Sequence, residues 1–157
     1  MAVSKTYLFD KGLEYIMDSS IGTQWDDSGA AYCFALYTAN NAPARTMANK
    51  TAVDGTLTEV TGGNYAQIPC TTRTVAESSN EVFFDSDNAA FGADTTIDAK
   101  WLICYQGTAG ALSGSNVPIF WVDLDDTSGS SYVSSNASTF TLNAPTGGWF
   151  KITQTQP

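Results

Sequence analysis

A chain of 157 residues is long enough for one domain, whereas two halves of it would each be short of core. Charged residues make up only 15% of the chain, below the roughly 25% typical of globular proteins, and Ser, Thr, Asn and Gly fill the difference. The net charge of −9 arises from 16 carboxylates against seven Lys and Arg with no basic cluster, which argues against nucleic acid and anionic membranes as partners.

The N-terminal residues predict no export or membrane anchoring. They lack the charged-then-apolar order of a signal peptide, and no apolar run in the chain approaches ~20 residues. We therefore expect a protein made in a cytoplasm, without a transmembrane helix.

The first predicted element is a helix from Thr6 to Asp18, within an N-terminal segment of residues 1–22. Phe9, Leu13 and Ile16 recur at intervals of three and four residues and form one apolar stripe. Ser4 or Thr6 is placed to cap this helix. A helix of about a dozen residues depends on docking for its stability, either against a sheet or against a neighbouring subunit.

Residues 31–39 predict a central strand, because both of its alternating faces are apolar. Residues 40–56 follow without clear periodicity and carry Arg45 and Lys50. An irregular stretch of this length in a small domain is usually functional or mobile.

Further strands are predicted at short spacing, with turns rich in Gly, Ser, Asn and Asp between them. Their ranges are 65–72, 81–84, 98–106, 117–124, 137–142 and 148–153. Seven or eight short strands without intervening helices predict a single mainly β domain: a jelly-roll-like β-sandwich over residues 30–153 with one N-terminal α-helix.

The residue types present argue against an enzyme. The chain contains no His, which removes the usual catalytic triads, His-ligated zinc and the ordinary neutral general base. No pair of carboxylates stands out for glycoside hydrolysis. The acidic runs at 85–88 and 123–127 have some oxygen ligands of a calcium loop but match plain turns better. We expect no metal and no cofactor.

Buried or interfacial side chains account for the remaining candidates. Cys33, Cys70 and Cys104 each lie in an apolar or strand-like run, which favours buried free thiols. Trp25 and Trp149 border turns, where an aromatic ring can serve an interface or a sugar-binding platform as well as the core.

Residues 59–67, Glu-Val-Thr-Gly-Gly-Asn-Tyr-Ala-Gln, resemble the E-V-(S/T)-G-G-x-Y-A-R block of a family of small virion proteins of tailed phages. The order of further segments agrees over most of the chain, at Leu-Tyr-Thr-Ala (36–39), Val-Phe-Phe (82–84), Phe-Gly (91–92), Leu-Ile-Cys-Tyr-Gln (102–106) and Ser-Thr-Phe-Thr-Leu (138–142). Three positions depart from the family pattern, where Gln67 replaces Arg, Asp85 stands at a common Pro and Phe91 replaces Trp.

The resemblance implies a bacteriophage virion structural protein located on the capsid surface, a capsid cement or decoration protein whose partner is the major capsid protein. Homo-oligomers are expected, trimers first and dimers next. The alternative is a tail-fibre or receptor-binding module that recognises host surface glycans. The residues expected to bind a partner are Phe9, Leu13, Trp25, Arg45, Lys50 and Trp149.

Overall fold

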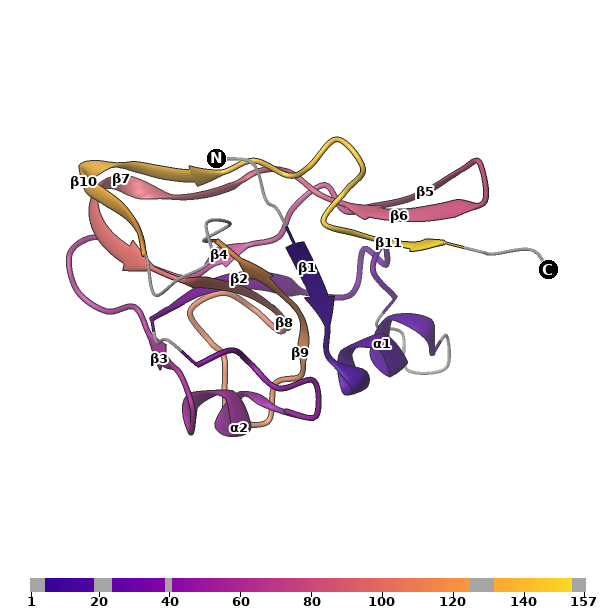
Figure 1. Cartoon of the computed structure of the whole chain (residues 1–157), viewed down its shortest axis with the longest axis horizontal. Coiled ribbons are helices and arrows are strands. Elements are labelled where there is room, and N and C mark those ends of the chain that lie inside the picture. The colour runs from indigo at the N-terminus through magenta and orange to yellow at the C-terminus, as the bar shows by residue number, and fades with distance from the viewer. Residues whose placement is uncertain (1–4, 19–23, 39–40, 125–131, 154–157) are drawn as a thin grey trace.

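The computed structural model describes residues 5–18, 24–38, 41–124 and 132–153, except the side chains of residues 93–95. It is mainly β, a sandwich of antiparallel sheets with an N-terminal helix, as predicted. A six-stranded sheet forms the larger layer and two small sheets face it (Figure 1). The larger sheet has the order β1-β9-β8-β2-β3, and β4 pairs with the other part of the β2 edge. Its strands are β1 (Lys5–Leu8), β9 (Pro118–Asp123), β8 (Trp101–Gln106), β2 (Tyr32–Thr38), β3 (Thr58–Glu59) and β4 (Ile68–Pro69).

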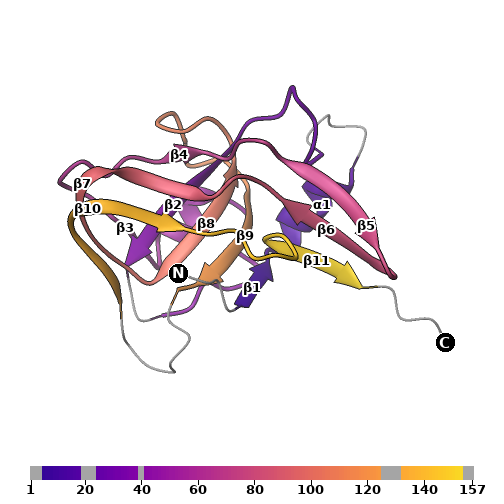
Figure 2. The same cartoon turned by 90° about the horizontal axis from the view of Figure 1, so that it is seen from above.

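The second layer consists of a long two-stranded ribbon and a three-stranded sheet beside it. The ribbon pairs β7 (Ala89–Ala99) with β10 (Val133–Leu142). The other sheet has the order β11-β6-β5, with β11 (Phe150–Thr153), β6 (Glu81–Asp85) and β5 (Thr74–Ser78). Figure 2, seen from above, shows the ribbon at the left and the three-stranded sheet at the right, so that the two follow one another along the long axis of the molecule.

Strand β2 is buried on both faces, as its residue pattern predicts. Phe34 and Leu36 contribute to the core between the two layers, whereas Ala35 and Tyr37 contribute to a second core on the opposite face. A sheet with two apolar faces must be covered on both of them, so other segments of the chain pack against each face.

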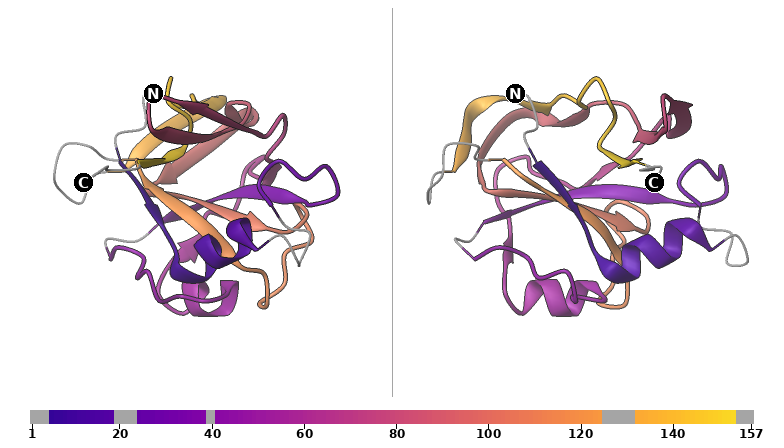
Figure 3. Two further views of the ribbon diagram at one scale, coloured as in Figure 1. Left: turned by 90° about the vertical axis from the view of Figure 1, so that its right-hand side faces the viewer. Right: turned by 45° about the vertical axis from the view of Figure 1, so that its right-hand side comes forward.

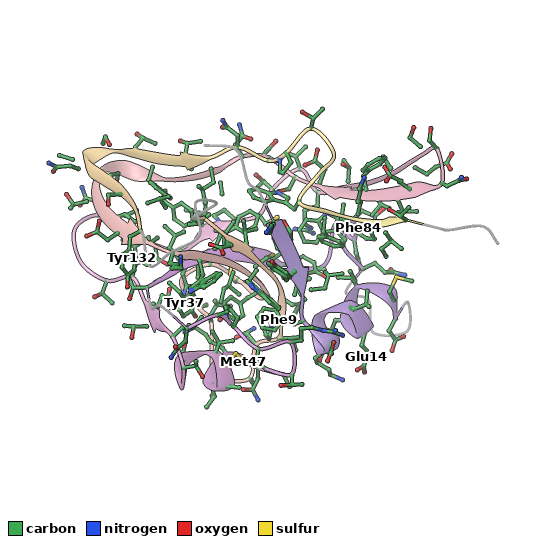
Figure 4. The ribbon with its side chains drawn as sticks, in the orientation of Figure 1. Phe9, Glu14, Tyr37, Met47, Phe84 and Tyr132 are labelled. Carbon is green, nitrogen blue, oxygen red and sulfur yellow. The ribbon has the colours of Figure 1, made fainter. Side chains whose placement is uncertain are left out.

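The two cores differ in what covers the sheet. Between the layers, aromatic rings from β6, β9 and β11 pack together, with Phe84 and Phe150 stacked at 4.4 Å. On the opposite face, Phe9, Tyr37 and Met47 lie under the larger sheet (Figure 4). The second core is closed by Val53, Leu57 and Leu112, from the segments around residues 41–57 and 107–116.

A short helix, α2 (Lys50–Asp54), lies within residues 40–56, so the prediction of a wholly irregular segment was wrong. The Asn49 side chain accepts a hydrogen bond from the Ala52 N–H at 2.9 Å and caps this helix. Val53 is fully buried against the second core. Five residues are too few to show helical periodicity, and packing on the sheet stabilises them.

The N-terminal segment differs from its prediction as well. Residues Lys5–Leu8 form strand β1, paired antiparallel with β9, and the helix α1 spans only Asp10–Met17. Its N-cap is Phe9 and not Ser4 or Thr6. Figure 3 shows the strand leading directly into α1, which packs against β9. Residues within 1–22 therefore contribute a strand to the sandwich.

Other predicted strands are shifted or divided. The strand expected at 65–72 is limited to Ile68–Pro69. The strand expected at 98–106 is divided at Lys100, whose N–H donates to the Tyr37 carbonyl at 2.9 Å. Strand β5 was not predicted, because all of its side chains are exposed and leave no apolar alternation.

Candidate docking groove between β1 and β11

A groove of about 660 Å³ lies between the first and last described strands of the chain. It is lined by residues 5–10, Leu13, Arg45, Pro145 and residues 147–151. This set of residues is called the β1–β11 groove below. Its volume falls within the roughly 300–1,000 Å³ common for binding sites.

Both strands that border the groove end their sheets. β1 pairs with β9 on one side only, and β11 pairs with β6 on one side only. Among the described strands, no further strand pairs with either of them on its other side. The groove therefore lies where an unpaired edge of each layer comes close to the other (Figure 1).

Two buried aromatic residues give the groove a firm floor. Phe9 is fully buried, and its ring lies 4.5 Å from that of Trp121. Trp149 is 1% exposed, and its Nε1–H donates to Ser86 Oγ at 2.7 Å. Because both rings are fixed by packing, the floor is preformed.

The rim of the groove is apolar on the side of β1 and α1. Tyr7 is 43% exposed and stacks on Trp121 at 5.2 Å between ring centroids. Leu13 is 38% exposed and lies on α1, with the exposed Met17 one turn further along the helix. Exposed apolar side chains next to a preformed hollow are typical of an interaction surface.

The groove gathers positive charge on an otherwise acidic protein. Three of the seven cationic residues line it, namely Lys5, Arg45 and Lys151, and among the described carboxylates only Asp10 does. Arg45 donates from Nη2 to Asp10 Oδ1 at 2.6 Å, and Lys151 donates to Glu81 Oε1 at 2.5 Å. Lys5 forms no ion pair with another residue that the structure describes.

The Lys151–Glu81 contact affects titration at the edge of the groove. The hydrogen bond from Lys151 lowers the pKa of Glu81, against a smaller desolvation effect that raises it. Glu81 is therefore ionised at neutral pH and holds the Lys151 ammonium at the groove.

Four of the six residues predicted to bind a partner meet in this groove, namely Phe9, Leu13, Arg45 and Trp149. Leu13 and Arg45 are exposed there, whereas Phe9 and Trp149 contribute to the floor. The other two predicted residues, Trp25 and Lys50, do not line it. The structure thus assembles most of the predicted set from three separate segments of the chain.

Trp25 belongs to the core and not to a surface. It is fully buried, and its Nε1–H donates to the Asp85 carbonyl at 2.9 Å. With Trp149 buried as well, neither ring can stack on a sugar, which corrects the proposed mechanism of glycan recognition through these two residues. A ring with no exposed face cannot serve as a platform.

Lys50 is also structural. Its ammonium donates to Asp54 Oδ2 at 2.8 Å and lies 3.0 Å from Glu59 Oε2. Burial lowers the pKa of Lys50, but the hydrogen bonds to Asp54 and Glu59 outweigh it and leave the pKa raised. Lys50 therefore holds α2 to β3 and is not free to meet a partner.

The Gly-Gly-x-Tyr-Ala block contributes to the same network. Glu59 Oε1 accepts hydrogen bonds from Tyr65 Oη at 3.1 Å and from Gln67 Nε2 at 2.8 Å. The Leu36 N–H donates to Tyr65 Oη at 2.9 Å, and burial raises the pKa of Tyr65. The side chains of this block thus hold neighbouring strands together, which explains its residue types without a partner.

The acidic turn at residues 85–88 uses its oxygens within the protein. Asp85 Oδ1 accepts from the Ser86 N–H, Asp87 Oδ2 from the Thr72 hydroxyl and Asn88 Oδ1 from the Ala144 N–H. No group of three or more potential metal ligands occurs among the described residues. The turn at 123–127 lies partly outside the described residues.

Cys33, Cys70 and Cys104 are buried free thiols, as their apolar neighbours predict. Burial raises the pKa of the Cys33 thiol to about 12. Thiols held neutral in this way are poor nucleophiles and behave as small apolar side chains.

Comparison of the chain with protein-family models, curated proteins and solved structures finds no match. Within the described residues, neither helix has the length and hydropathy needed to cross a bilayer. The groove is therefore characterised by its own geometry.

Among the groove residues that were not predicted from the sequence are Lys5, Tyr7 and Lys151. Lys5–Leu8 alternates between exposed and half-buried positions in the structure, but its residues, Lys-Thr-Tyr-Leu, show no polar–apolar alternation and gave no strand signal. The helical stripe that begins at Phe9 favoured a helix there instead. Lys151 gave no signal, because only the fold brings β11 next to β1.

Proposed function

We propose that the protein is a bacteriophage virion structural protein, a capsid cement or decoration protein that binds the shell of major capsid protein and stabilises it. The observation that carries the proposal is the β1–β11 groove, a preformed hollow with an apolar rim and a local excess of cations. The likeness of residues 59–67 to small phage virion proteins supports the class of partner. Contacts repeated over a closed shell multiply a modest energy for each contact.

Self-association is part of this proposal, as a trimer or alternatively a dimer. A shell offers docking positions on symmetry axes, and a homo-oligomer can match the symmetry of such a position. Val75 and Val82 are exposed on the three-stranded sheet and do not line the groove. They leave a second apolar surface for contacts between copies.

The test is co-sedimentation of the purified protein with mature shells that lack it, followed by heating of the complex. We expect saturable binding and a higher temperature of shell disruption. Leu13→Ser, in the groove, should weaken binding, whereas Tyr132→Ser should not, because Tyr132 has nearly the same exposure but lies outside both the groove and the surface of Val75 and Val82. Absence of wild-type binding to shells would overturn the proposal.

A further inference from the structure

Strand β1 presents to the β1–β11 groove a hydrogen-bonding edge with which no other described strand pairs. The Phe9 N–H donates to the Ile119 carbonyl at 3.0 Å, in register with the pairing of Tyr7 with Trp121. In an antiparallel pair, hydrogen-bonded residues alternate, so Lys5, Tyr7 and Phe9 face β9. The peptide groups of Thr6 and Leu8 therefore face outward, into the groove.

None of the hydrogen bonds found between described residues uses these outward peptide groups. An edge of this kind is a template for one more strand, and proteins usually protect it with a bulge, a proline or a cover. Along Lys5–Leu8 there is no proline, and the register with β9 runs without a shift. The four residues span roughly 13 Å, enough for a short extended segment.

Cationic side chains next to this edge of β1 favour an acidic segment. Lys5 lies at one end of β1, Arg45 lies beside the other end, and Lys151 lies across the groove on β11. Arg45 is 72% exposed and Lys151 is 50% exposed, so both remain accessible while paired with Asp10 and Glu81. An acidic segment would meet attraction here and repulsion over most of the remaining surface.

We propose that the β1–β11 groove binds an extended, acidic segment of the partner protein, which adds as a strand to the free edge of β1. This inference rests on the proposed function for the identity of the partner, a shell protein. The backbone hydrogen bonds of Thr6 and Leu8 hold the segment. The three cations determine its charge, and the exposed faces of Tyr7 and Leu13 accept its apolar side chains.

The first experiment uses a peptide and no shells, so that it tests the groove alone. The probe is acetyl-Thr-Glu-Val-Asp-Val-Glu-Val-Thr-amide, titrated into the isotopically labelled full chain and followed by NMR. We expect saturable shifts confined to groove residues and slower amide exchange at Thr6 and Leu8. Two control peptides are used, one with Lys at every acidic position and one with methylated backbone nitrogens, and neither should bind.

Variants of the protein separate charge from backbone pairing. Lys5→Gln and Lys151→Gln should each weaken peptide binding about two- to five-fold. Each change removes one solvent-exposed charge that attracts the carboxylates of the peptide. Lys11→Gln is the matched control, since Lys11 is a cation of the same region that does not line the groove. Thr6→Pro removes an outward N–H without touching the bonds to β9 and should abolish binding while the fold is retained.

The outcomes distinguish this inference from the proposed function. Equal binding of the acidic and basic peptides, or no binding of the acidic peptide, would overturn the inference whatever the shells do. If the wild type and Thr6→Pro bind shells equally well, the strand-addition mode is wrong and the shell-binding function stands. If the acidic peptide binds as expected but the protein does not bind shells, the proposed function is wrong. The groove is then still a binding site for acidic extended segments.

Discussion

Gly12 allows helix α1 to lie directly on β9. A Cβ atom at this position would lie 2.5 Å from both the Cα and the carbonyl oxygen of Ile119. Those atoms belong to the backbone of β9 in the larger sheet, so displacing them costs free energy. The absence of a side chain at Gly12 thus determines how closely α1, and the groove rim that it carries, packs on the larger sheet.

Gly12→Ala should therefore destabilise the protein by about 1–3 kcal/mol, although alanine favours a helix by roughly 1 kcal/mol. The measurement is the urea midpoint followed by tryptophan fluorescence. Gly55→Ala is the matched control, because Gly55 has φ −69° and its Cβ would meet nothing closer than 3.4 Å. That change should leave stability unaltered or raise it by about 0.4–1 kcal/mol. Equal effects of the two changes would contradict the close packing at Gly12.

The buried thiol of Cys33 predicts a loss of stability at alkaline pH. Burial is the main cause that raises its pKa to about 12, with the nearby Cys70 thiol and Glu59 carboxylate adding to it. In the unfolded chain a thiol titrates near 8.5. Between these values the unfolded state binds fewer protons than the native state, so the free energy of unfolding falls as pH rises.

The expected slope is up to about 1.4 kcal/mol per pH unit for this one group. It is measured by urea unfolding under reducing conditions at about pH 7.5, 8.5 and 9.5, the range that spans the ordinary thiol pKa. Cys33→Ala should give a smaller slope over the same range, while its stability relative to the wild type should improve as pH rises. Parallel slopes for both proteins would show that Cys33 ionises as readily in the native state.

At the element scale, the hairpin of β5 and β6 depends on a two-residue turn. Ser78 pairs with Glu81, and the intervening Ser79 and Asn80 have φ values of 51° and 67°. Two consecutive positive φ values define a type I′ turn, for which Asn-Gly is the preferred pair. Serine is a poor occupant of the first position, so the native hairpin is not optimised.

Replacing Ser79-Asn80 by Asn-Gly should stabilise the hairpin by about 0.5–1 kcal/mol, because glycine and asparagine accept positive φ at lower cost. Amide exchange within β5 and β6 measures the effect locally, and the urea midpoint measures it globally. Asn80→Val is the opposing control and should speed exchange in the same strands. A slower exchange in Asn80→Val than in the wild type would rule out the type I′ turn.

The elements that sequence analysis predicted well are those with buried faces. The doubly apolar pattern of residues 31–39 identified β2, and the apolar runs near 117–124 located β9. Strand β5 could not be found this way, because backbone pairing with β6 leaves no mark on its exposed side chains. Helix α2 was missed since five residues cover little more than one turn.

The groove could be predicted only in its parts. Leu13 and Arg45 stood out as candidates because an apolar stripe and an irregular loop carry them. Leu13 and Arg45 lie near β11 because β1 pairs with β9, more than 100 residues away in the chain. The pairing of β11 with β6 in the second layer completes the arrangement. Tertiary pairing of this kind has no local signal. The burial of Trp25 and Trp149 likewise follows from the packing of the two layers.

At the scale of the whole molecule, charge is distributed unevenly. Of the seven cations, Lys50, Lys100 and Arg73 are used within the fold, with Arg73 donating to the carbonyls of Trp25, Asp27, Ala30 and Cys70. Among the described carboxylates, several form no ion pair with a described cation, namely Asp26, Asp27, Glu77, Asp85, Asp87 and Asp98. The same charge asymmetry opposes compactness of the chain and favours an acidic ligand at one place.

Salt should therefore change stability and groove binding in opposite directions. Screening of repulsion among the carboxylates should raise the urea midpoint between about 0.05 and 0.5 M NaCl, since the Debye length falls from about 14 Å to about 4 Å. Screening of Lys5, Arg45 and Lys151 should weaken binding of the acidic peptide several-fold over the same range. Both quantities are measured on the wild type in the same buffers, with a sucrose series as the uncharged control. A lower midpoint at high salt would mean that attractive pairs such as Lys151–Glu81 outweigh the repulsion. Salt-insensitive peptide binding would mean that the cations of the groove do not select the ligand.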